Sequence, residues 1–306
     1  EDIVSSIVAI EEESMNHPAE LAIHEFLQNV SLGKAKMNKA TLHHIAKDVE
    51  DALSRQFSGD KRKFKLRMSN LGRKKCQLWF EKNHPEKKQP DSPYFLINMI
   101  LGDIVEAVFK GLLRASKVKF EDSKKVVLKT KKKDIEGSYD LVLNNKVDDV
   151  KSTSPWSYDN KFVDFNTLKS KDSFGYVAQL AGYAKARGVK AGGWWAVNKA
   201  NGNFKYVDAE DLNMNEELKK IDDTIAYIEN DEPFERCYEP IQETYYGKAS
   251  GNTKLGIECS LCSFRDACWT DLQVLPSKVS RSSNPPLINY VKVADGKAEV
   301  KEQVRV

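Results

Sequence analysis

The segment EGSYDLVLNNKVDDVK, residues 136–151, reads as two strands joined by a tight turn. Apolar and polar residues alternate over 138–143, and a period of two is typical of a strand. Asn144-Asn145 suits a two-residue turn, because asparagine tolerates the left-handed backbone that such turns need. Residues 146–151 then run back as the next strand. The segment predicts an antiparallel hairpin at the centre of the fold.

Further elements flank this hairpin. Apolar residues recur at helical spacing over 101–115, and a second helical pattern over 172–187 stops at Gly188. Asn201-Gly202 favours a turn between two more strands. Strands are predicted over 126–130, 192–197 and 203–207, and further helices within 1–56 and near 210–230. Strands interleaved with helices predict an α/β fold with a mixed central sheet flanked by helices and a helical N-terminal region.

The composition excludes several classes of protein. The 306 residues are 41% hydrophobic, which suffices for a sizeable core, and 48 Lys and Arg against 45 Asp and Glu leave a net charge of only +3. No run approaches the roughly 18 apolar residues of a membrane span, and the acidic start EDIVSSIVAIEEES is unlike a signal peptide. Five cysteines are too few for a disulfide scaffold, so we expect reduced thiols or metal ligands in a reducing compartment.

A basic segment is hidden by the near-neutral total. Residues 61–88 contain 11 Lys and Arg against two Glu, with Phe64, Trp79 and Phe80 among them. One interpretation is a solvated helix face. The other is a nucleic-acid track, where cations meet phosphates and aromatic rings stack on bases.

Two acidic residues and a lysine coincide on the hairpin. Alternation places Asp149 and Lys151 on one face of a strand, and the turn brings Asp140 alongside them. Buried carboxylates need a partner, and their hard oxygens suit Mg²⁺ or Mn²⁺. The lysine would then orient, or help deprotonate, a water that attacks a phosphate. A surface hairpin with an ordinary salt bridge is the alternative interpretation.

Neighbouring residues favour the metal-site interpretation. Glu106, on the preceding helix, offers a third carboxylate, and the hydroxyl groups of residues 152–154 follow the lysine. Gln179 and Tyr183 are four positions apart and therefore lie on one face of the next helix. The set as a whole predicts a site that binds a divalent metal and a phosphate.

Taken in order, these residues resemble the conserved motifs of the PD-(D/E)XK nuclease superfamily, in its RecB-like branch. The family carries Gly-x-x-x-His or Gly-x-x-x-Glu on a helix, Gly-x-x-Asp on a strand, (Asp/Glu)-x-Lys on the next strand and Gln-x-x-x-Tyr on a later helix. These motifs are matched, in that order, by Gly102 and Glu106, Gly137 and Asp140, Asp149 and Lys151, and Gln179 and Tyr183. The resemblance covers about residues 70–270, and it departs from many members in having Glu rather than His at 106.

The resemblance implies a restriction-endonuclease-like core and metal-dependent hydrolysis of DNA. Glu106, Asp140 and Asp149 would hold one or two Mg²⁺ or Mn²⁺ ions, and Lys151 would position the attacking water. All of these residues are therefore expected to be catalytic.

Gln179 and Tyr183, on the later helix, are also expected to be catalytic. By resemblance, Gln179 and Tyr183 position the DNA backbone or the other catalytic side chains. The implied activity is an exonuclease acting on single-stranded DNA or duplex ends, in prokaryotic recombination and repair or in phage DNA metabolism. A structure-specific endonuclease, or an inactive DNA-binding or scaffold module with a zinc site, are the alternatives.

The cysteines predict a second metal site. Cys259, Cys262 and Cys268 form a Cys-x₂-Cys-x₅-Cys motif in ECSLCSFRDACW, and Cys76 and Cys237 are the candidates for a fourth ligand. The spacing is compatible with a zinc site of four thiolates and with a [4Fe–4S] cluster.

The cysteine motif is similar to that of the iron–sulfur subgroup of RecB-like nucleases, which includes the AddB nuclease domain and the CRISPR-associated RecB-like exonucleases. In that subgroup one cysteine precedes the nuclease core and three follow it. The resemblance implies a structural [4Fe–4S] cluster that staples the core and leaves Cys237 free. Its ligands would be Cys76, Cys259, Cys262 and Cys268.

The resemblance also suggests how the chain is organised. We expect a helical N-terminal region over 1–60, a nuclease core with its iron–sulfur staple over 61–270, and a peripheral extension over 271–306. The expected partner is DNA and not a membrane, and the expected location is the reducing cytoplasm of a prokaryote or a phage host.

Overall fold

The computed structural model describes residues 17–59 and 63–294. Contacts between residues divide the chain into two compact units, each assembled from two separate segments. The first takes the described residues up to Arg73 together with Ser92–Asn230, and the second takes Lys74–Asp91 together with the described residues from Asp231 onward. These units cut across the three regions expected from the sequence.

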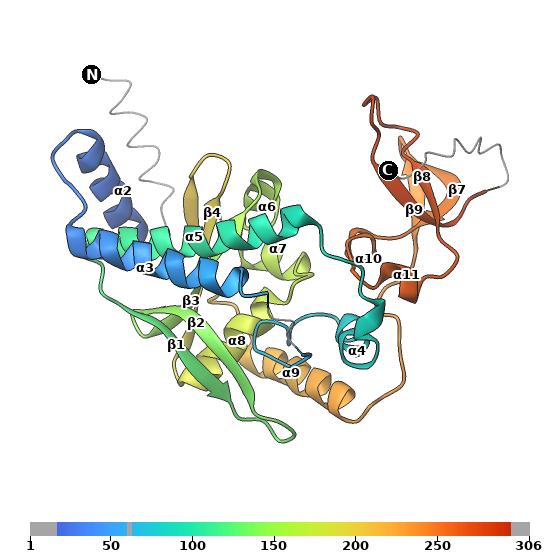
Figure 1. Cartoon of the computed structure of the whole chain (residues 1–306), viewed down its shortest axis with the longest axis horizontal. Helices are drawn as coiled ribbons and strands as arrows, with labels where there is room; N and C mark the ends of the chain where they lie inside the picture. The colour runs from blue at the N-terminus through green and yellow to red at the C-terminus, as the bar shows by residue number, and fades with distance from the viewer. Residues whose placement is uncertain (1–16, 60–62, 295–306) are drawn as a thin grey trace. The chain divides into compact units, whose positions relative to one another are not determined.

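The first unit is built on a five-stranded sheet with the order β1-β2-β3-β4-β5 (Figure 1). Neighbouring strands are antiparallel except β3 and β4, which are parallel. The strands are β1 (Phe120–Leu128), β2 (Ile135–Leu143), β3 (Lys146–Thr153), β4 (Lys190–Asn198) and β5 (Phe204–Asp208). The sheet is therefore mixed, and the predicted α/β fold is confirmed.

The central hairpin forms as its sequence predicts. β2 and β3 meet at Leu143 and Lys146, and the two residues between them form the turn. Asn144 and Asn145 have φ angles of 50° and 60°, the left-handed conformation that a two-residue hairpin turn requires.

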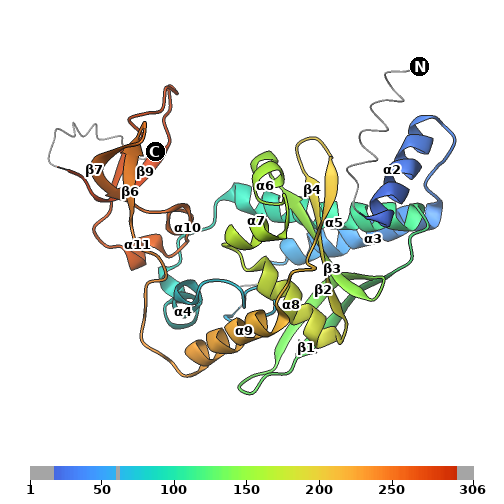
Figure 2. The same cartoon turned by 180° about the vertical axis from the view of Figure 1, so that it is seen from behind.

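Helices cover both sides of this sheet. α5 packs on β3, and α2 and α3 pack on α5, whereas α8 packs on β1, β3 and β4 and on α9. Figures 1 and 2 show these two groups on opposite sides of the strands. The helices of this unit are α2 (Pro18–Ser31), α3 (Lys39–Gln56), α5 (Pro93–Ala115), α6 (Pro155–Asn160), α7 (Phe165–Ser170), α8 (Tyr176–Arg187) and α9 (Met214–Glu229).

Two predicted helices begin at different residues in the structure. α5 starts at Pro93 rather than 101, because Ser92 caps it by accepting a hydrogen bond from the N–H of Tyr94 and the proline suits the first turn. α8 starts at Tyr176 rather than 172, after Gly175 with φ of 79°, and ends at Gly188 as predicted.

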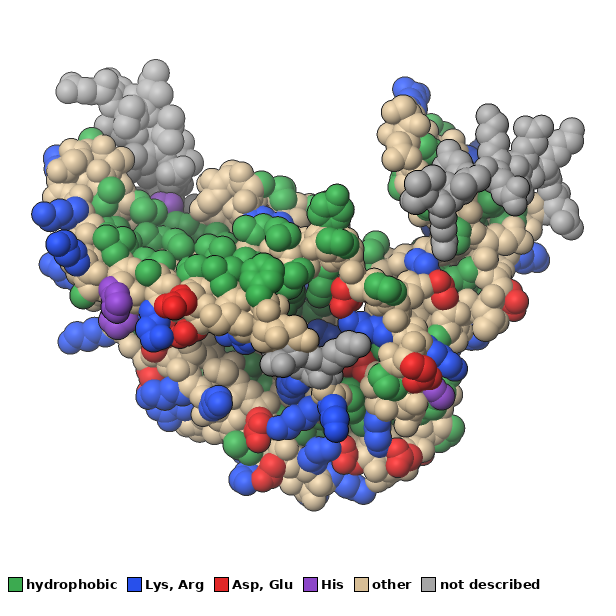
Figure 3. All heavy atoms as spheres, in the orientation of Figure 1, with side chains coloured by type: hydrophobic (Ala, Val, Ile, Leu, Met, Phe, Trp, Pro, Cys, Tyr) green, Lys and Arg blue, Asp and Glu red, His purple; other side chains and the backbone are tan. Residues whose placement is uncertain are grey.

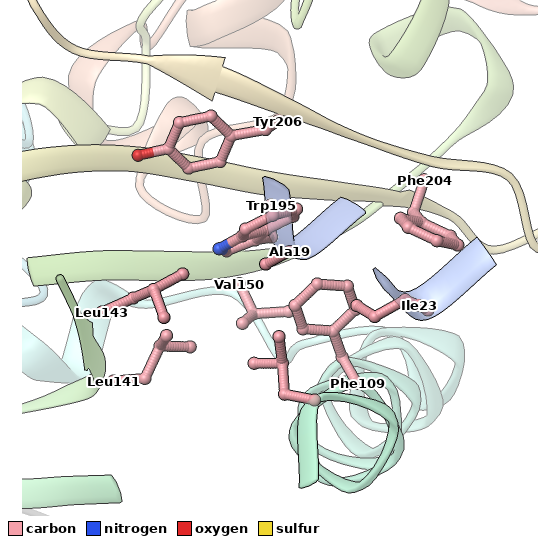
Figure 4. Packing of buried hydrophobic residues seen from close by; sticks show 10 residues of the cluster. Ala19, Ile23, Phe109, Leu141, Leu143, Val150, Trp195, Phe204 and Tyr206 are labelled. Atoms are coloured by element: carbon pink, nitrogen blue, oxygen red, sulfur yellow. The ribbon is translucent and has the colours of Figure 1, made fainter. Parts of the chain in front are cut away.

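The core on the α5 side of the sheet is aromatic and aliphatic. Figure 4 shows Phe109 of α5 and Ile23 of α2 packed towards Val150 of β3 and Trp195 of β4. Consecutive strand residues face opposite ways. Because Val150 is buried in this core, its neighbours Asp149 and Lys151 point away from it, as the alternation predicted.

The outer side of α5 is also apolar. Ile97, Leu101 and Val108 are exposed there, and Leu27 and Val30 of α2 are exposed as well. Figure 3 shows hydrophobic side chains gathered over these helices. α5 therefore carries apolar side chains towards the core and towards the surface.

The second unit contains a four-stranded antiparallel sheet with the order β6-β7-β9-β8. The expected peripheral extension thus contributes two of its strands. The elements are α4 (Lys75–Asn83), η1 (Pro85–Lys87), β6 (Ile241–Tyr245), β7 (Lys248–Lys254), α10 (Ile257–Ser260), α11 (Arg265–Cys268), β8 (Gln273–Pro276) and β9 (Leu287–Lys292).

Across residues 17–59 and 63–294, none of the helices has both the length and the apolar character needed to span a membrane.

Two glycines of the sequence motifs meet very different surroundings. A Cβ atom at Gly137 would lie 2.5 Å from Cβ of Met68 and 2.7 Å from Cε1 of Tyr183, so only glycine lets this part of β2 approach α8. A Cβ atom at Gly102, on α5, would meet nothing within 4 Å.

The Gly137→Ala variant should lower the free energy of unfolding by about 1–3 kcal/mol, because the added methyl group overpacks the contact with Tyr183. Gly102→Ala is the matched control and should raise it by up to about 1 kcal/mol, because alanine restricts the unfolded chain and favours a helix. Denaturant unfolding of both variants measures the difference. Equal effects of the two substitutions would contradict the close approach at Gly137.

Candidate active site and cysteine cluster

The candidate active site lies where β2 and β3 part, a place that we call the fork. Pairing of the two strands ends at Leu141 and Asp148, and β3 continues alongside β4. Just beyond the last pair, Asp140 Oδ2 accepts a hydrogen bond of 2.8 Å from the backbone N–H of Val150. The Asp140 carboxylate thus replaces the backbone carbonyl group that would accept this hydrogen bond if the two strands stayed paired.

Asp149 and Lys151 form a buried ion pair on β3 at the fork. Lys151 Nζ lies 2.5 Å from Asp149 Oδ2 and 4.8 Å from the ring centroid of Tyr176. Burial by itself lowers the pKa of Lys151, but the carboxylates of Asp149 and Asp140 outweigh it and hold this pKa above its ordinary value. Lys151 therefore carries its positive charge at neutral pH.

Glu106 brings a third carboxylate from α5. Lys110, one helical turn further on, lies 3.0 Å from Glu106 Oε1 and 3.0 Å from Asp122 Oδ1. Burial, followed by the charge of Asp140, raises the pKa of Glu106 to about 7. Glu106 and Asp140 therefore lie within electrostatic reach of each other, as the predicted site requires.

The carboxylates at the fork oppose one another's ionisation. Burial, followed by the charge of Asp149, raises the pKa of Asp140 to about 7. Burial also raises the pKa of Asp149, against the opposing effect of Lys151. Because like charges in a buried place are costly, the arrangement favours either a proton or a bound cation.

The donor set fits a divalent cation in its chemistry. Carboxylate oxygens suit Mg²⁺ or Mn²⁺, and Asp149 Oδ2 is buried without a well-oriented hydrogen bond, although Lys151 lies close to it. Among the residues that the structure describes, no three Asp, Glu, His or Cys side chains already surround a metal position. Glu106, Asp140 and Asp149 would therefore draw closer together around an ion, and the lysines now partly balance their charge.

The predicted helical pair also lies at this site. Gln179 donates a hydrogen bond of 3.4 Å to the hydroxyl group of Tyr183. Burial, with a further contribution from Asp140 and Asp149, raises the pKa of Tyr183 to about 12. Tyr183 is therefore a neutral hydroxyl donor close to the carboxylates.

A second lysine at the site escaped the sequence analysis. The side chain of Lys161 is 5% exposed, with Nζ 3.8 Å from Asp172 and 4.4 Å from the ring centroid of Tyr176. Asp172 also accepts hydrogen bonds of 2.9 Å from two N–H groups at the start of α8. No regular spacing relates Lys161 to Lys151, so no sequence signal was available. Lys110, four residues after Glu106, could have been found from helical spacing.

Asp148 has a different environment from its neighbour Asp149. It accepts hydrogen bonds of 3.1 Å from the N–H of Gly193, from Trp195 Nε1 and from the hydroxyl of Tyr206. Asp148 therefore anchors the sheet from within the core, and Asp149 is the carboxylate that contacts Lys151.

The second unit contains all the cysteines. The N–H of Cys76, in α4, donates a hydrogen bond of 3.2 Å to Cys237 Sγ. Burial raises the pKa of the Cys259, Cys262 and Cys268 thiols. Cys76 and Cys237, far apart in the sequence, thus lie in contact, whereas among the described residues no three cysteines already surround a metal position.

The Cys76–Cys237 contact bears on the choice of the fourth ligand. A hydrogen bond between the two side chains lowers the pKa of Cys237 to about 6 and raises that of Cys76. Four thiolates complete either a zinc site or an iron–sulfur cluster, so one of the five is surplus. Because Cys76 and Cys237 lie together, the assignment of Cys76 as the fourth ligand stays a prediction.

The basic segment over 61–88 divides between the two units after Arg73. Several of its lysines already form ion pairs, and Phe80 is buried. These pairs are Lys65–Glu136 at 2.6 Å, Lys75–Glu235 at 2.5 Å and Lys88–Asp91 at 2.7 Å. These pairs favour the interpretation as solvated faces for those positions, and the nucleic-acid track stays a prediction.

Comparisons with known proteins add little to this geometry. No family model and no curated protein matches the chain. Among solved structures, the chain is similar to one described as the crystal structure of SSO0001, with a TM-score of 0.39 and 16% sequence identity over 75% of this chain and 96% of that one. A likeness this distant does not bear on function.

In the metal-free protein, the contribution of Asp140 and Glu106 to stability should fall as pH rises from about 4 to about 7, because both have pKa values of about 7 when folded. Over that range these two groups bind more protons in the folded state than in the unfolded state. Asp140→Asn should therefore be more stable than the wild type at pH 8 and no more stable at pH 4. Mg²⁺ should stabilise the wild type at pH 8 and affect the variant less.

Thermal unfolding across this pH range, with Mg²⁺ and with EDTA, measures both effects. Asp134→Asn is the control, because this carboxylate is half-exposed on the β1–β2 loop and its removal should change little. A stability difference between the wild type and Asp140→Asn that stays the same from pH 4 to pH 8 would contradict the crowding of carboxylates at the fork.

Anaerobically purified protein should be brown, with about four irons and four acid-labile sulfides per chain. Cys76→Ser should lose the colour and unfold more easily, because binding energy at such a site is folding energy. Cys237→Ser should keep both the colour and the stability. The opposite result for the two variants would make Cys237 the ligand, and stoichiometric zinc without sulfide would rule out the cluster.

Proposed function

We propose that this chain is a divalent-metal-dependent deoxyribonuclease, acting as an exonuclease in recombination, repair or phage DNA metabolism. One observation supports this most directly: the buried ion pair of Asp149 and Lys151 lies beside the crowded carboxylates of Asp140 and Glu106. A purely structural salt bridge would not need further half-buried carboxylates within electrostatic reach. Side chains of this kind are what metal-dependent phosphodiester hydrolysis uses.

Glu106, Asp140 and Asp149 are the residues that would hold Mg²⁺ or Mn²⁺. The ion, when bound, supplies a water of lowered pKa and offsets the charge of the reacting phosphate. Lys151 is protonated at neutral pH, so its role is to hold the water and the phosphate oxygens by its charge.

Gln179 and Tyr183 would orient the phosphate. Tyr183 keeps its proton at neutral pH, because its pKa is about 12, and can donate a hydrogen bond to a phosphate oxygen. Gln179 lies 3.4 Å from that hydroxyl group and directs it. Both side chains come from α8, which the close approach at Gly137 holds against β2.

The proposal includes a structural [4Fe–4S] cluster in the second unit, held by Cys76 together with the three cysteines of the downstream motif. Such a cluster would join α4 to segments nearly two hundred residues later in the chain, and closing so long a loop restricts the unfolded state strongly. Four thiolates leave no open coordination position, so the cluster would take no part in the hydrolysis.

Asp149→Ala and Lys151→Ala should each reduce DNA cleavage by at least about 100-fold. The first variant loses a ligand of the metal, and the second loses the positive charge that stabilises the reacting phosphate. Lys146→Ala is the matched control: this lysine lies at the opposite end of the same strand and is 41% exposed. Cleavage of an end-labelled oligonucleotide with Mg²⁺ or Mn²⁺ measures the rates. Wild-type rates in Lys151→Ala would end the proposal.

An exonuclease should degrade linear DNA progressively and leave covalently closed circular DNA intact. The comparison uses the two forms of one plasmid with the wild-type protein and Mn²⁺, followed by gel electrophoresis. Rapid linearisation of the closed circle would instead favour the structure-specific endonuclease.

A further inference from the structure

Two aromatic side chains are exposed to solvent in the segment that links the strand carrying Lys151 to α8. Trp156, in α6, is 62% exposed, and Phe174, in the loop before α8, is 55% exposed. Large aromatic side chains usually gain more from burial than from any exposed position. Both belong to the first unit, and neither has a role in the core or in the catalytic set described above.

Phe174 is connected to the catalytic lysine through one further ring. It stacks on Tyr176 with ring centroids 5.6 Å apart and planes 17° from parallel. Lys161 Nζ lies 5.2 Å from the Phe174 centroid and 4.4 Å from that of Tyr176. Lys151 Nζ lies 4.8 Å from the same Tyr176 centroid, and the Phe162 ring also contacts Tyr176. An open ring, a half-buried ring and two ammonium groups thus form a continuous row that ends at the candidate active site.

Trp156 also has a lysine beside its ring. Lys171 Nζ lies 5.8 Å from the Trp156 ring centroid and donates a hydrogen bond of 2.7 Å to the carbonyl of Asn160. The segment 155–176 therefore presents two exposed rings, each accompanied by a lysine.

Exposed rings beside cations have the chemistry that a single nucleic-acid strand requires. A base stacks on the face of a ring, and the phosphate that follows it meets an ammonium group. Bases in a duplex are already stacked on their neighbours, so only unpaired nucleotides can use such rings. A protein partner would gain from the apolar rings but not from ammonium groups that lead to a phosphate-cleaving site.

We propose that Phe174 and Trp156 stack on unpaired bases next to the scissile phosphate, with the exposed Lys171 meeting a neighbouring phosphate. This inference rests on the proposed nuclease function and deepens it. It makes the segment 155–176 the part of the chain that selects an unpaired end and feeds it towards Lys151.

Base stacking can be tested without cleavage. Fluorescence anisotropy in EDTA would compare a labelled oligothymidylate with an abasic strand of the same length and charge. Phe174→Ala and Trp156→Ala should each weaken binding of the oligothymidylate by about 5- to 100-fold, and should leave binding of the abasic strand unchanged. Phe174→Trp should restore the affinity. Phe57→Ala, which removes a ring that is 63% exposed elsewhere in the same unit, should change neither.

The outcomes separate this inference from the proposed function. Unchanged binding of oligothymidylate by both alanine variants would overturn the inference, and so would an equal loss with the abasic strand. In cleavage of a single strand with Mn²⁺, Phe174→Ala should raise KM more than it lowers kcat. If the wild type cleaves no DNA but shows the base-dependent loss of binding, the nuclease proposal fails and the stacking site stands. Cleavage with a normal KM by both alanine variants would leave the nuclease proposal standing and the stacking site refuted.

Discussion

The hydrogen bond from the backbone N–H of Val150 to Asp140 is the contact on which the candidate site depends. β3 begins as the antiparallel partner of β2 and continues as the parallel partner of β4. A strand that leaves its neighbour exposes polar backbone groups, and those must find other partners. Asp140 supplies one, and in doing so it is held beside Asp149 and Lys151 on the far side of the fork.

The ion pairs at the fork compensate the charges of its carboxylates only in part. Lys151 pairs with Asp149, and Lys110 pairs with Glu106 and Asp122, yet the pKa values of Asp140 and Glu106 still rise to about 7. Buried carboxylates that resist ionisation are unfavourable for stability, and such arrangements are most often found where a site has a function. A cation that binds all three would relieve the repulsion, which links the stability of this unit to the chemistry proposed for it.

The two proposed centres belong to different units of the chain. Every residue of the carboxylate and lysine set lies in the first unit, and every cysteine lies in the second. Both units are built from discontinuous segments, and the chain passes from one to the other three times. A centre that bonds α4 to the segment after α9 would tie together the parts of the second unit that the sequence separates most widely. Loss of the cluster and loss of the catalytic residues should therefore have different consequences, the first mainly for folding and the second for cleavage.

What the sequence by itself determined is local. The hairpin over 136–151, its Asn144-Asn145 turn and the end of α8 at Gly188 follow from alternation and from backbone angles that particular residues favour. The motif spacing also selected Asp149 and Lys151, which form an ion pair of 2.5 Å at the fork. Tertiary structure alone decided that Cys237 lies against Cys76, that Lys161 lies over Tyr176, and that the C-terminal segment joins a second sheet. These contacts join residues from separate elements, and their distances depend on how the elements pack, which no spacing along the chain encodes.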